Sequence, residues 1–302
     1  MPQTVLILGS TGRFGRHAAA QFSGAGWMVR HFDRARDDLA LAARGADIIV
    51  NGWNPPYTDW AAQLPALHAQ VIEAARQNGS TVILPGNVYV FGRDTPAPWT
   101  AESPHDARNP LGRIRIEMEQ AYQQAPIRTI MLRGGDFIDT ARSGNWFDKV
   151  LTKSLAKGRF TYPGDPGIPH AWAYLPDFCR AVVQLAERRE TLPGFTDIPF
   201  PGYTMSGRDM ADVLNRIHPN GARLRRMSWR PLALVRPFWP MAGCLLEMRY
   251  LWDTPHWLDR AKFDHILPGF RNTPVRDALA SAVELPSVEH KVHPDKTVPA
   301  GG

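Results

Sequence analysis

The fold is decided near the start of the chain, by the stretch Val5-Leu6-Ile7-Leu8-Gly9-Ser10-Thr11-Gly12-Arg13-Phe14-Gly15. Four aliphatic residues without alternation are typical of a strand that is buried on both faces of a parallel sheet. The glycines that follow have the spacing GxxGxxG, and we expect a helix to begin near Arg13. In such a strand–turn–helix unit the first glycine permits a tight turn, the second lets a diphosphate approach the backbone, and the third lets helix and strand pack closely.

The helix that follows this loop should favour an anion at its first turn. Free N–H groups and the helix dipole both attract negative charge there. We therefore predict that the loop binds the diphosphate of NAD or NADP. The predicted contacts are Gly9, Thr11, Gly12, Arg13, Phe14 and Gly15.

Short apolar runs alternate with longer amphipathic segments along the first two thirds of the chain. This alternation predicts strands over 27–32, 46–50, 81–84 and 127–132, and helices over 37–43, 64–77, 110–124 and 177–187. Asn109 is the predicted N-cap of the third of these helices, since Pro110 follows it. Together the segments indicate an α/β Rossmann fold, a doubly wound parallel sheet.

After Gly134 the pattern loosens into loops rich in glycine and proline. We predict an NAD(P)-binding Rossmann domain formed by 1–137 with 170–194, and a smaller C-terminal α/β substrate lobe formed by 138–169 with 195–285. Residues 286–302 contain no aromatic side chain, so a flexible tail is expected there.

The charge balance is moderately basic, with 35 Lys and Arg against 29 Asp and Glu. An excess of +6 suits an anionic cofactor, nucleic acid or an acidic membrane surface, or it is simply dispersed over the surface. No block of five or six basic residues marks a nucleic-acid footprint, so no nucleic-acid partner is predicted.

Cellular location is inferred from the cysteines and from the apolar segments. Cys179 and Cys244 have neither metal-ligand nor disulfide spacing, which favours a reducing cytoplasm and predicts no metal site. The N-terminus lacks the features of a signal peptide. The apolar stretch 231–246 is too short to span a bilayer and is interrupted by Arg236, so no transmembrane segment is predicted.

The end of the second predicted strand should select the cofactor. Asp33, 24 residues beyond Gly9, is placed to bind the adenosine ribose of NAD, whereas Arg34, with Arg13 and Arg36, suits the 2′-phosphate of NADP. Asp33 as a turn former and Arg34 as a surface charge are the alternatives. We predict NADP, with NAD as the alternative, because three guanidinium groups flank the expected phosphate position.

Asn51 is a further candidate contact, to the cofactor ribose. It follows the third predicted strand, at the carboxyl edge where doubly wound sheets bind their ligands.

Five segments in this order and spacing resemble the extended short-chain dehydrogenase/reductases and the NAD-dependent epimerase/dehydratase superfamily. They are the glycine loop and residues 46–50, 82–92, 132–137 and 173–177. The resemblance covers most of residues 4–190. The stretch between the second strand and Ala46 is shorter than is usual in these proteins, so we expect one edge strand to be abbreviated or absent.

The resemblance implies a catalytic Ser or Thr at the position of Asn87, and a Tyr-x-x-x-Lys pair at the positions of Leu111 and Arg115. Leucine cannot transfer a proton, so the chain resembles an atypical subgroup that lacks this pair. Arg115 keeps a cation on the same helix and is expected to bind cofactor ribose or phosphate, although its high pKa makes it a poor acid.

Any chemistry must then use another acid, and Tyr89 is the first candidate because it follows the fourth strand at the expected nicotinamide edge. Asn87 is the candidate for binding a substrate carbonyl. A packed aromatic ring and a turn former are the respective alternatives.

Two aromatic groups have no assigned role. His170, Trp172 and Tyr174 alternate along an extended segment, and they either line a substrate pocket or pack against the smaller lobe. Residues 229–257 combine six aromatic side chains with several arginines. They form a lid, touch a membrane interface, or are buried within the smaller lobe.

Two functions of different classes are compatible with these features. The first is an NAD(P)-dependent oxidoreductase or epimerase that acts on a small carbonyl or sugar-derived substrate, and the second is a non-catalytic NAD(P)-binding sensor or assembly protein. The expected partner is a small-molecule substrate, and a homodimer is compatible with either function.

Overall fold

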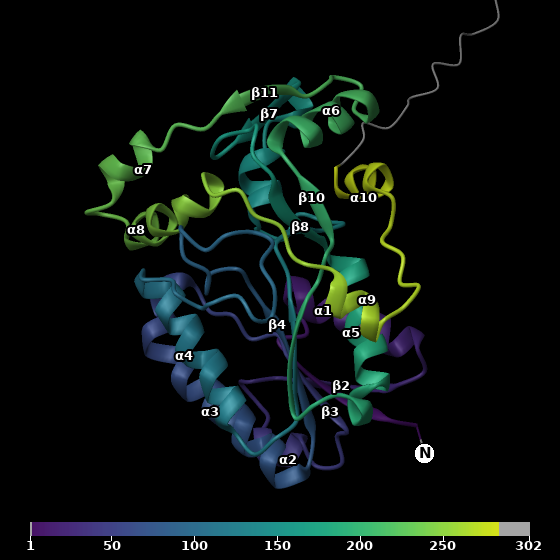
Figure 1. The fold of residues 1–302 in the computed structure, drawn as a ribbon. Helices are drawn as coiled ribbons and strands as arrows, with labels where there is room; N and C mark the ends of the chain where they lie inside the picture. The colour runs from purple at the N-terminus through teal and green to yellow at the C-terminus, as the bar shows by residue number, and fades with distance from the viewer. Residues whose placement is uncertain (1, 284–302) are drawn as a thin grey trace, which may run out of the picture.

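Strand β1 (Thr4–Leu8) lies inside a sheet of six parallel strands in the computed structural model, which describes residues 2–283 (Figure 1). The strand order is β2-β1-β3-β4-β5-β9. The other strands are β2 (Met28–Phe32), β3 (Ile48–Asn51), β4 (Thr81–Gly86), β5 (Thr129–Arg133) and β9 (Phe195–Pro199). The predicted flexible tail over 286–302 lies outside the described residues.

Helices cover both faces of this sheet (Figure 1). One face carries α1 (Arg13–Gly24) and α5 (Leu175–Glu187), and the other carries α2 (Leu39–Ala42), α3 (Trp60–Asn78) and α4 (Pro110–Gln124). Val5 and Ile7 of β1 pack on the first side, and Leu6 and Leu8 pack on the second. Because both faces of the strand are buried, its sequence is apolar without alternation.

The chain reverses its direction of winding at β1, because β2 and β3 lie on opposite sides of it. At such a switch point the loops after the two central strands diverge, and the crevice at their carboxyl ends is where doubly wound sheets bind ligands. The glycine loop follows β1, and Asn51 ends β3. The topology therefore places both candidate segments at one crevice.

The structure confirms the predicted Rossmann fold, with element ends that shift by a few residues. Helix α3 begins at Trp60, four residues before the predicted start, and β4 continues to Gly86. No described strand lies outside β2, which is the sheet edge. This agrees with the expectation that one edge strand is abbreviated or absent, since only the short α2 lies between β2 and β3.

A smaller lobe lies above the carboxyl edge of the sheet (Figure 1). Its strands are β6 (Asp136–Ile138), β7 (Arg159–Tyr162), β8 (His170–Tyr174), β10 (Tyr203–Met205) and β11 (Arg223–Arg226). Its helices are α6 (Gly207–Ile217), α7 (Arg230–Val235), α8 (Pro240–Glu247) and α10 (Val275–Ala282), with short helical turns at Phe147–Leu151 (η2), Leu155–Lys157 (η3) and Met248–Trp252 (η5). Two further short turns belong to the region of the central sheet: Tyr57–Asp59 (η1) lies between β3 and α3, and Arg189–Thr191 (η4) lies between α5 and β9. Among the described helices, none is long and apolar enough to cross a membrane.

The predicted boundary at residue 194 needs a correction. Strand β9, which we assigned to the smaller lobe, pairs with β5 in the central sheet. Phe263 and Leu267, from α9 (Ala261–Ile266) and the residue after it, are buried in the same core as α1 and α5. The five residues of β9 form a short run after Pro193 and Gly194, and no helix separates this run from the irregular sequence of the smaller lobe that follows. The sequence therefore did not show that the run belongs to the central sheet. The predicted boundary at residue 170 needs a similar correction, because β8 pairs with β6 and β10 in a separate three-stranded sheet. The rest of the division into lobes stays a prediction.

Candidate active site

The glycine loop closes through backbone contacts that only glycine permits. Gly9 has a φ of +72°, and a Cβ on Gly15 would lie 2.2 Å from the Gly9 carbonyl oxygen. The N–H of Gly12 donates to that same oxygen over 3.0 Å. The first glycine thus makes the tight turn, and the third lets α1 pack on β1.

The N-terminus of α1 is not capped by a side chain. Its N-cap residue, Gly12, has none, and the first turn contains no acidic residue and begins with the half-buried Arg13. A Cβ on Gly12 would meet only the Gly9 carbonyl oxygen, at 3.2 Å, among the described atoms within 4 Å. Thr11 is exposed beside it. The space over the loop is therefore open, and free N–H groups face it.

Phe14 has a different role from its neighbours in the loop. Its ring is buried in the core, 6.0 Å from the ring of Phe178 in an edge-to-face arrangement. A contact between Phe14 and the cofactor, as predicted, would therefore involve the backbone N–H and not the ring.

The loop after β3 packs against the glycine loop. The N–H of Gly52 donates to the Leu8 carbonyl oxygen over 3.0 Å, and a Cβ on Gly52 would lie 2.8 Å from that oxygen. The next residue, Trp53, lies beside Gly9 and 5.5 Å from the ring of Phe32. The two loops at the switch point thus form one continuous wall.

The candidate cofactor-selecting residues lie at the exposed end of β2. The Asp33 carboxylate accepts a hydrogen bond from the N–H of Ala35 over 2.9 Å, and its other oxygen lies 3.5 Å from Nε of Arg36. Asp33 is therefore a turn former, one of the alternatives that the sequence left open. Arg34 is exposed, and its guanidinium makes no ion pair with another described residue.

The side chain of Asn51 turns away from the crevice into the interior, and its contact with the cofactor ribose stays a prediction. Its side chain is buried, with the amide nitrogen 3.2 Å from both the His68 Nδ1 and the Tyr122 hydroxyl. Its amide oxygen accepts from the N–H of Trp53 over 3.1 Å. Burial lowers the pKa of His68 to about 3, so the neutral ring is the hydrogen-bond acceptor in this network. The side chain joins β3 to α3 and α4.

Asn87 closes a turn at the end of β4. Its side-chain oxygen accepts from the N–H of Tyr89 over 3.0 Å, and its backbone carbonyl accepts from the guanidinium of Arg133. The turn-forming alternative is thus observed. The binding of a substrate carbonyl by Asn87 stays a prediction.

The Tyr89 hydroxyl lies 2.6 Å from the hydroxyl of Tyr57, a residue that sequence reasoning did not single out. Both rings pack near Trp60, with centroids 4.9 Å away for Tyr57 and 6.1 Å away for Tyr89. Burial raises the pKa of both tyrosines, and the neighbouring Tyr57 raises that of Tyr89 further. Tyr57 lies in the loop after β3, at the same carboxyl edge, which was the only signal in the sequence that pointed to it.

The positions of the absent Tyr-x-x-x-Lys pair are buried. Leu111 is 3% exposed, and Arg115 is 6% exposed. The Arg115 guanidinium donates to the Pro85 carbonyl over 3.2 Å and lies 5.8 Å from the centre of the Trp60 ring. It therefore lies below the tyrosine pair, in the interior. The proposed contact with cofactor ribose or phosphate is not tested by these contacts.

The first turn of α4 is capped in an unexpected way. Asn109 occupies the predicted N-cap position, but its side chain makes no cap hydrogen bond. Instead, Glu247 at the end of α8 accepts from the Asn109 amide over 2.9 Å and from the N–H of Leu111 over 2.6 Å. This contact spans more than 130 residues of sequence, so no local pattern was able to reveal it, and it ties α8 to the candidate site.

A half-buried carboxylate and a buried imidazole lie near the tyrosine pair. The Asp136 carboxylate is 2.8 Å from Nε2 of His170, and the imidazole stacks on Trp252 with ring centroids 4.6 Å apart. The negative charge of Asp136 contributes to raising the pKa of both Tyr57 and Tyr89, after burial. His170 is fully covered, so the packing alternative describes it, whereas the side chain of Asp136 is 22% exposed.

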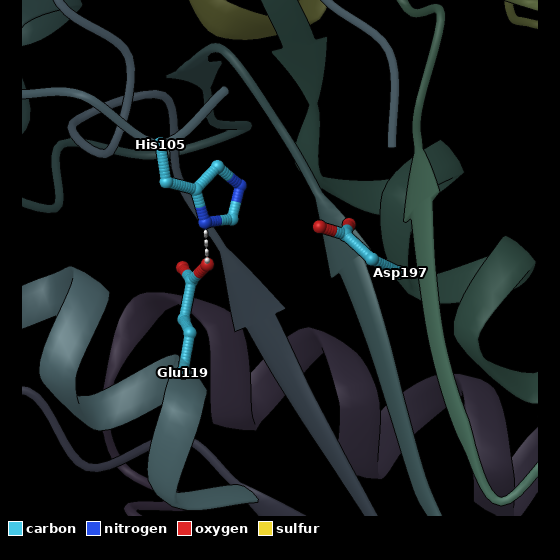
Figure 2. A group of neighbouring side chains, drawn as sticks. All are labelled: His105, Glu119 and Asp197. Carbon is cyan, nitrogen blue, oxygen red and sulfur yellow. Dashed lines mark ion pairs between the residues drawn. The ribbon is translucent and has the colours of Figure 1, made fainter. Parts of the chain in front are cut away.

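A group of ionisable residues lies below the site, where His105, Glu119 and Asp197 approach one another (Figure 2). Figure 2 shows Glu119 reaching from α4 towards His105, and Asp197 projecting from β9. These side chains have the chemistry of metal ligands, but the guanidinium of the fully buried Arg133 donates to Asp197 and to Glu119, the latter over 2.7 Å. A guanidinium thus already occupies the position between the two carboxylates, and the cluster ties α4, β5 and β9 together.

Fold and crevice together define a Rossmann α/β protein whose glycine loop and tyrosine pair meet at the carboxyl edge of the sheet. No protein-family model matches the chain, and no curated protein sequence matches it.

Solved structures share this fold over nearly the whole chain. One is a UDP-glucuronic acid 4-epimerase from Bacillus cereus in complex with UDP-glucuronic acid and NAD, at 14% identity and a TM-score of 0.71, covering 93% of this chain and 98% of that one. Another is a UDP-glucose 4-epimerase from Brucella ovis in complex with NAD, at 17% identity and a TM-score of 0.67, covering 93% and 97%. A dTDP-4-dehydrorhamnose reductase from Clostridium acetobutylicum has 14% identity and a TM-score of 0.68, covering 93% and 98%. The chain thus has the fold of NAD-dependent epimerases and related reductases.

Proposed function

We propose that this protein is an NAD(P)-dependent oxidoreductase or epimerase that acts on a small carbonyl or sugar-derived substrate. The observation that carries the proposal is the open glycine loop at the N-terminus of α1. Its free N–H groups and the absence of side chains at Gly9, Gly12 and Gly15 suit a diphosphate in close contact with the backbone. Two structural neighbours were solved with NAD, which supports the same group of cofactors.

The finer proposal is that NADP is preferred. Asp33 already accepts a backbone hydrogen bond and lies near Arg36, whereas Arg34 is exposed and has no ion pair among the described residues. A free guanidinium is well suited to a phosphate, with which it forms charge-assisted hydrogen bonds. NAD remains the alternative, with Asp33 as the residue that binds the ribose.

In the proposed chemistry the dinucleotide, when bound, supplies or accepts a hydride. During reduction of a carbonyl, the Tyr89 hydroxyl donates its proton to the carbonyl oxygen, and the hydride completes the alcohol. Tyr57 then returns a proton to Tyr89 through the 2.6 Å hydroxyl contact, and solvent restores the proton of Tyr57. Asn87 holds the substrate carbonyl near Tyr89. In oxidation every proton moves in the reverse direction.

One observation favours the second candidate function, a non-catalytic NAD(P)-binding sensor or assembly protein. Leu111 occupies the position of the usual catalytic tyrosine and is buried. Tyr89 offers the enzyme an alternative acid, and this is why the catalytic function is preferred.

The experiment that separates the two functions starts with binding of NADPH and NADH, followed by a turnover screen. The screen uses nucleoside-diphosphate sugars and small aldehydes and ketones, and follows cofactor absorbance and the epimeric products. Turnover of a sugar or carbonyl compound supports the enzyme. Tight cofactor binding without turnover of any of these compounds supports the sensor.

Arg34→Ala tests the choice of cofactor. We expect weaker NADPH binding by about 1 to 3 kcal/mol, the scale of one charge-assisted contact, and almost unchanged NADH binding. Arg216→Ala removes an exposed arginine from α6 and is the matched control. An equal loss for both cofactors would mean that Arg34 has a structural role, and tighter NADH binding by the unmodified protein would favour Asp33 as the selecting residue.

A further inference from the structure

The whole positive excess of the chain comes from one segment. Residues 213–246 contain six arginines and no Asp, Glu or Lys. Removing these six from the 35 Lys and Arg leaves 29, which equals the 29 Asp and Glu of the full chain. The six are Arg216, Arg223, Arg225, Arg226, Arg230 and Arg236, all of them exposed, and none makes an ion pair with another described residue. The charge is therefore concentrated on α6, β11, α7 and the α7–α8 connection, and is not dispersed.

The same segment exposes large apolar side chains. Phe238 is 89% exposed and Leu234 is 77% exposed, with Val235 and Trp239 beside them at the end of α7 and the approach to α8. Other aromatic residues of this region, such as Trp229 and Trp252, are buried in the smaller lobe. Burial in the lobe therefore accounts for Trp229 and Trp252. It does not account for the exposed group, which we call the apolar tip and which consists of Leu234, Val235, Phe238 and Trp239.

The apolar tip lies on the outside of the molecule. Helix α7 lies at the periphery, away from the central sheet, and the chain reaches it from β11 at the top of the smaller lobe (Figure 1). The inner side of α8 packs against η1, which contains Tyr57, and Glu247 at its end contacts Leu111. The segment is thus anchored to the candidate site on one side and free on the other.

We propose that residues 213–246 dock the protein on an anionic lipid surface. The apolar tip enters the boundary between headgroups and acyl chains, and the guanidinium groups of the same segment bind the negatively charged headgroups. An anionic bilayer satisfies both features at once, because it offers negative charge at its surface and an apolar interior directly below it.

Two other partners fit these residues less well. A second copy of the chain, joined through the same patch about a two-fold axis, would bring six unpaired arginines against six others. Nucleic acid would bind the arginines, but it would leave the aliphatic Leu234 and Val235 without an apolar environment. The observations therefore favour lipid, and the other partners are outcomes of the test.

Co-sedimentation with lipid vesicles tests the proposal, and it does not depend on turnover. We expect binding to vesicles of phosphatidylcholine mixed in equal parts with phosphatidylglycerol, and little binding to phosphatidylcholine alone. Phe238→Asp should lower the partition coefficient by at least about tenfold, because it removes a large inserted side chain and adds a charge. Leu41→Asp is the matched control, since Leu41 is an exposed apolar residue on α2, away from the patch, and it should bind as the unmodified protein does.

A second variant tests the electrostatic part. Arg230→Gln with Arg236→Gln should weaken binding to the mixed vesicles by about fivefold for each arginine, and added salt should weaken the unmodified protein in the same direction. The proposal is overturned by absence of binding to the mixed vesicles, by equal binding to both vesicle types, or by unchanged binding of Phe238→Asp. A dimer that Phe238→Asp converts to a monomer, without vesicle binding, would overturn it in favour of a second copy. Binding of duplex DNA in place of vesicles would overturn it in favour of nucleic acid.

Discussion

Tyr89→Phe is expected to lower turnover by about two to four orders of magnitude, the usual contribution of a general acid, and to leave cofactor affinity nearly intact. The phenylalanine ring keeps the contact with Trp60 and loses only the hydroxyl that lies 2.6 Å from Tyr57. Steady-state kinetics on a substrate found in the screen, together with NADPH titration, measures both effects. Tyr203→Phe is the control, because that hydroxyl donates to the Thr273 carbonyl in the smaller lobe and should not affect turnover.

The pH dependence gives this prediction a second readout. Burial raises the pKa of Tyr89, and a group whose pKa is raised holds its proton to higher pH. The rate of reduction should therefore stay level from neutral to moderately alkaline pH, below the ordinary tyrosine pKa of about 10. If Tyr89→Phe keeps full activity, the assignment of the acid is wrong, and Asp136 with its His170 partner becomes the next candidate.

Gly12→Asp is expected to weaken NADPH and NADH binding by about two orders of magnitude or more. The carboxylate would stand at the N-cap of α1, where the diphosphate is expected, and would repel it. An aspartate is also a good N-cap residue, so the variant should keep the thermal stability of the fold. Loss of binding would then reflect the loop and not unfolding, and nicotinamide fluorescence with a thermal melt measures the two separately.

Gly12→Asn separates charge from bulk, because asparagine has the same shape without the charge. It should weaken binding less than aspartate does. Equal losses in the two variants would assign the effect to crowding near the Gly9 carbonyl, and undiminished binding by Gly12→Asp would show that the dinucleotide does not use this loop.

Local sequence patterns predicted most of the fold, because a parallel sheet has local signatures. Val5 to Leu8 is buried on both faces, and in the glycine loop Gly9 makes the turn and Gly15 allows the close packing of α1 on β1. Strand β9 was missed, since its five residues gain their place only by pairing with β5. The cap of α4 was missed for a similar reason, because Glu247 comes from a distant helix.

The side chains of the site depended more on packing. Asn51 has the right place at the edge of the sheet, but packing of α3 against α4 brings His68 and Tyr122 to it, and its side chain turns inwards. Tyr57 and Tyr89 are 32 residues apart, and only the meeting of the loops after β3 and β4 makes them a hydrogen-bonded pair. Such a pair has no signature in the sequence.

The most direct measurement is a crystal structure of the protein grown with NADPH. The account predicts the diphosphate against the N–H groups of Arg13 and Phe14 in the first turn of α1, with the 2′-phosphate beside Arg34. NADPH bound elsewhere on the chain, or an empty glycine loop at saturating NADPH, would contradict it.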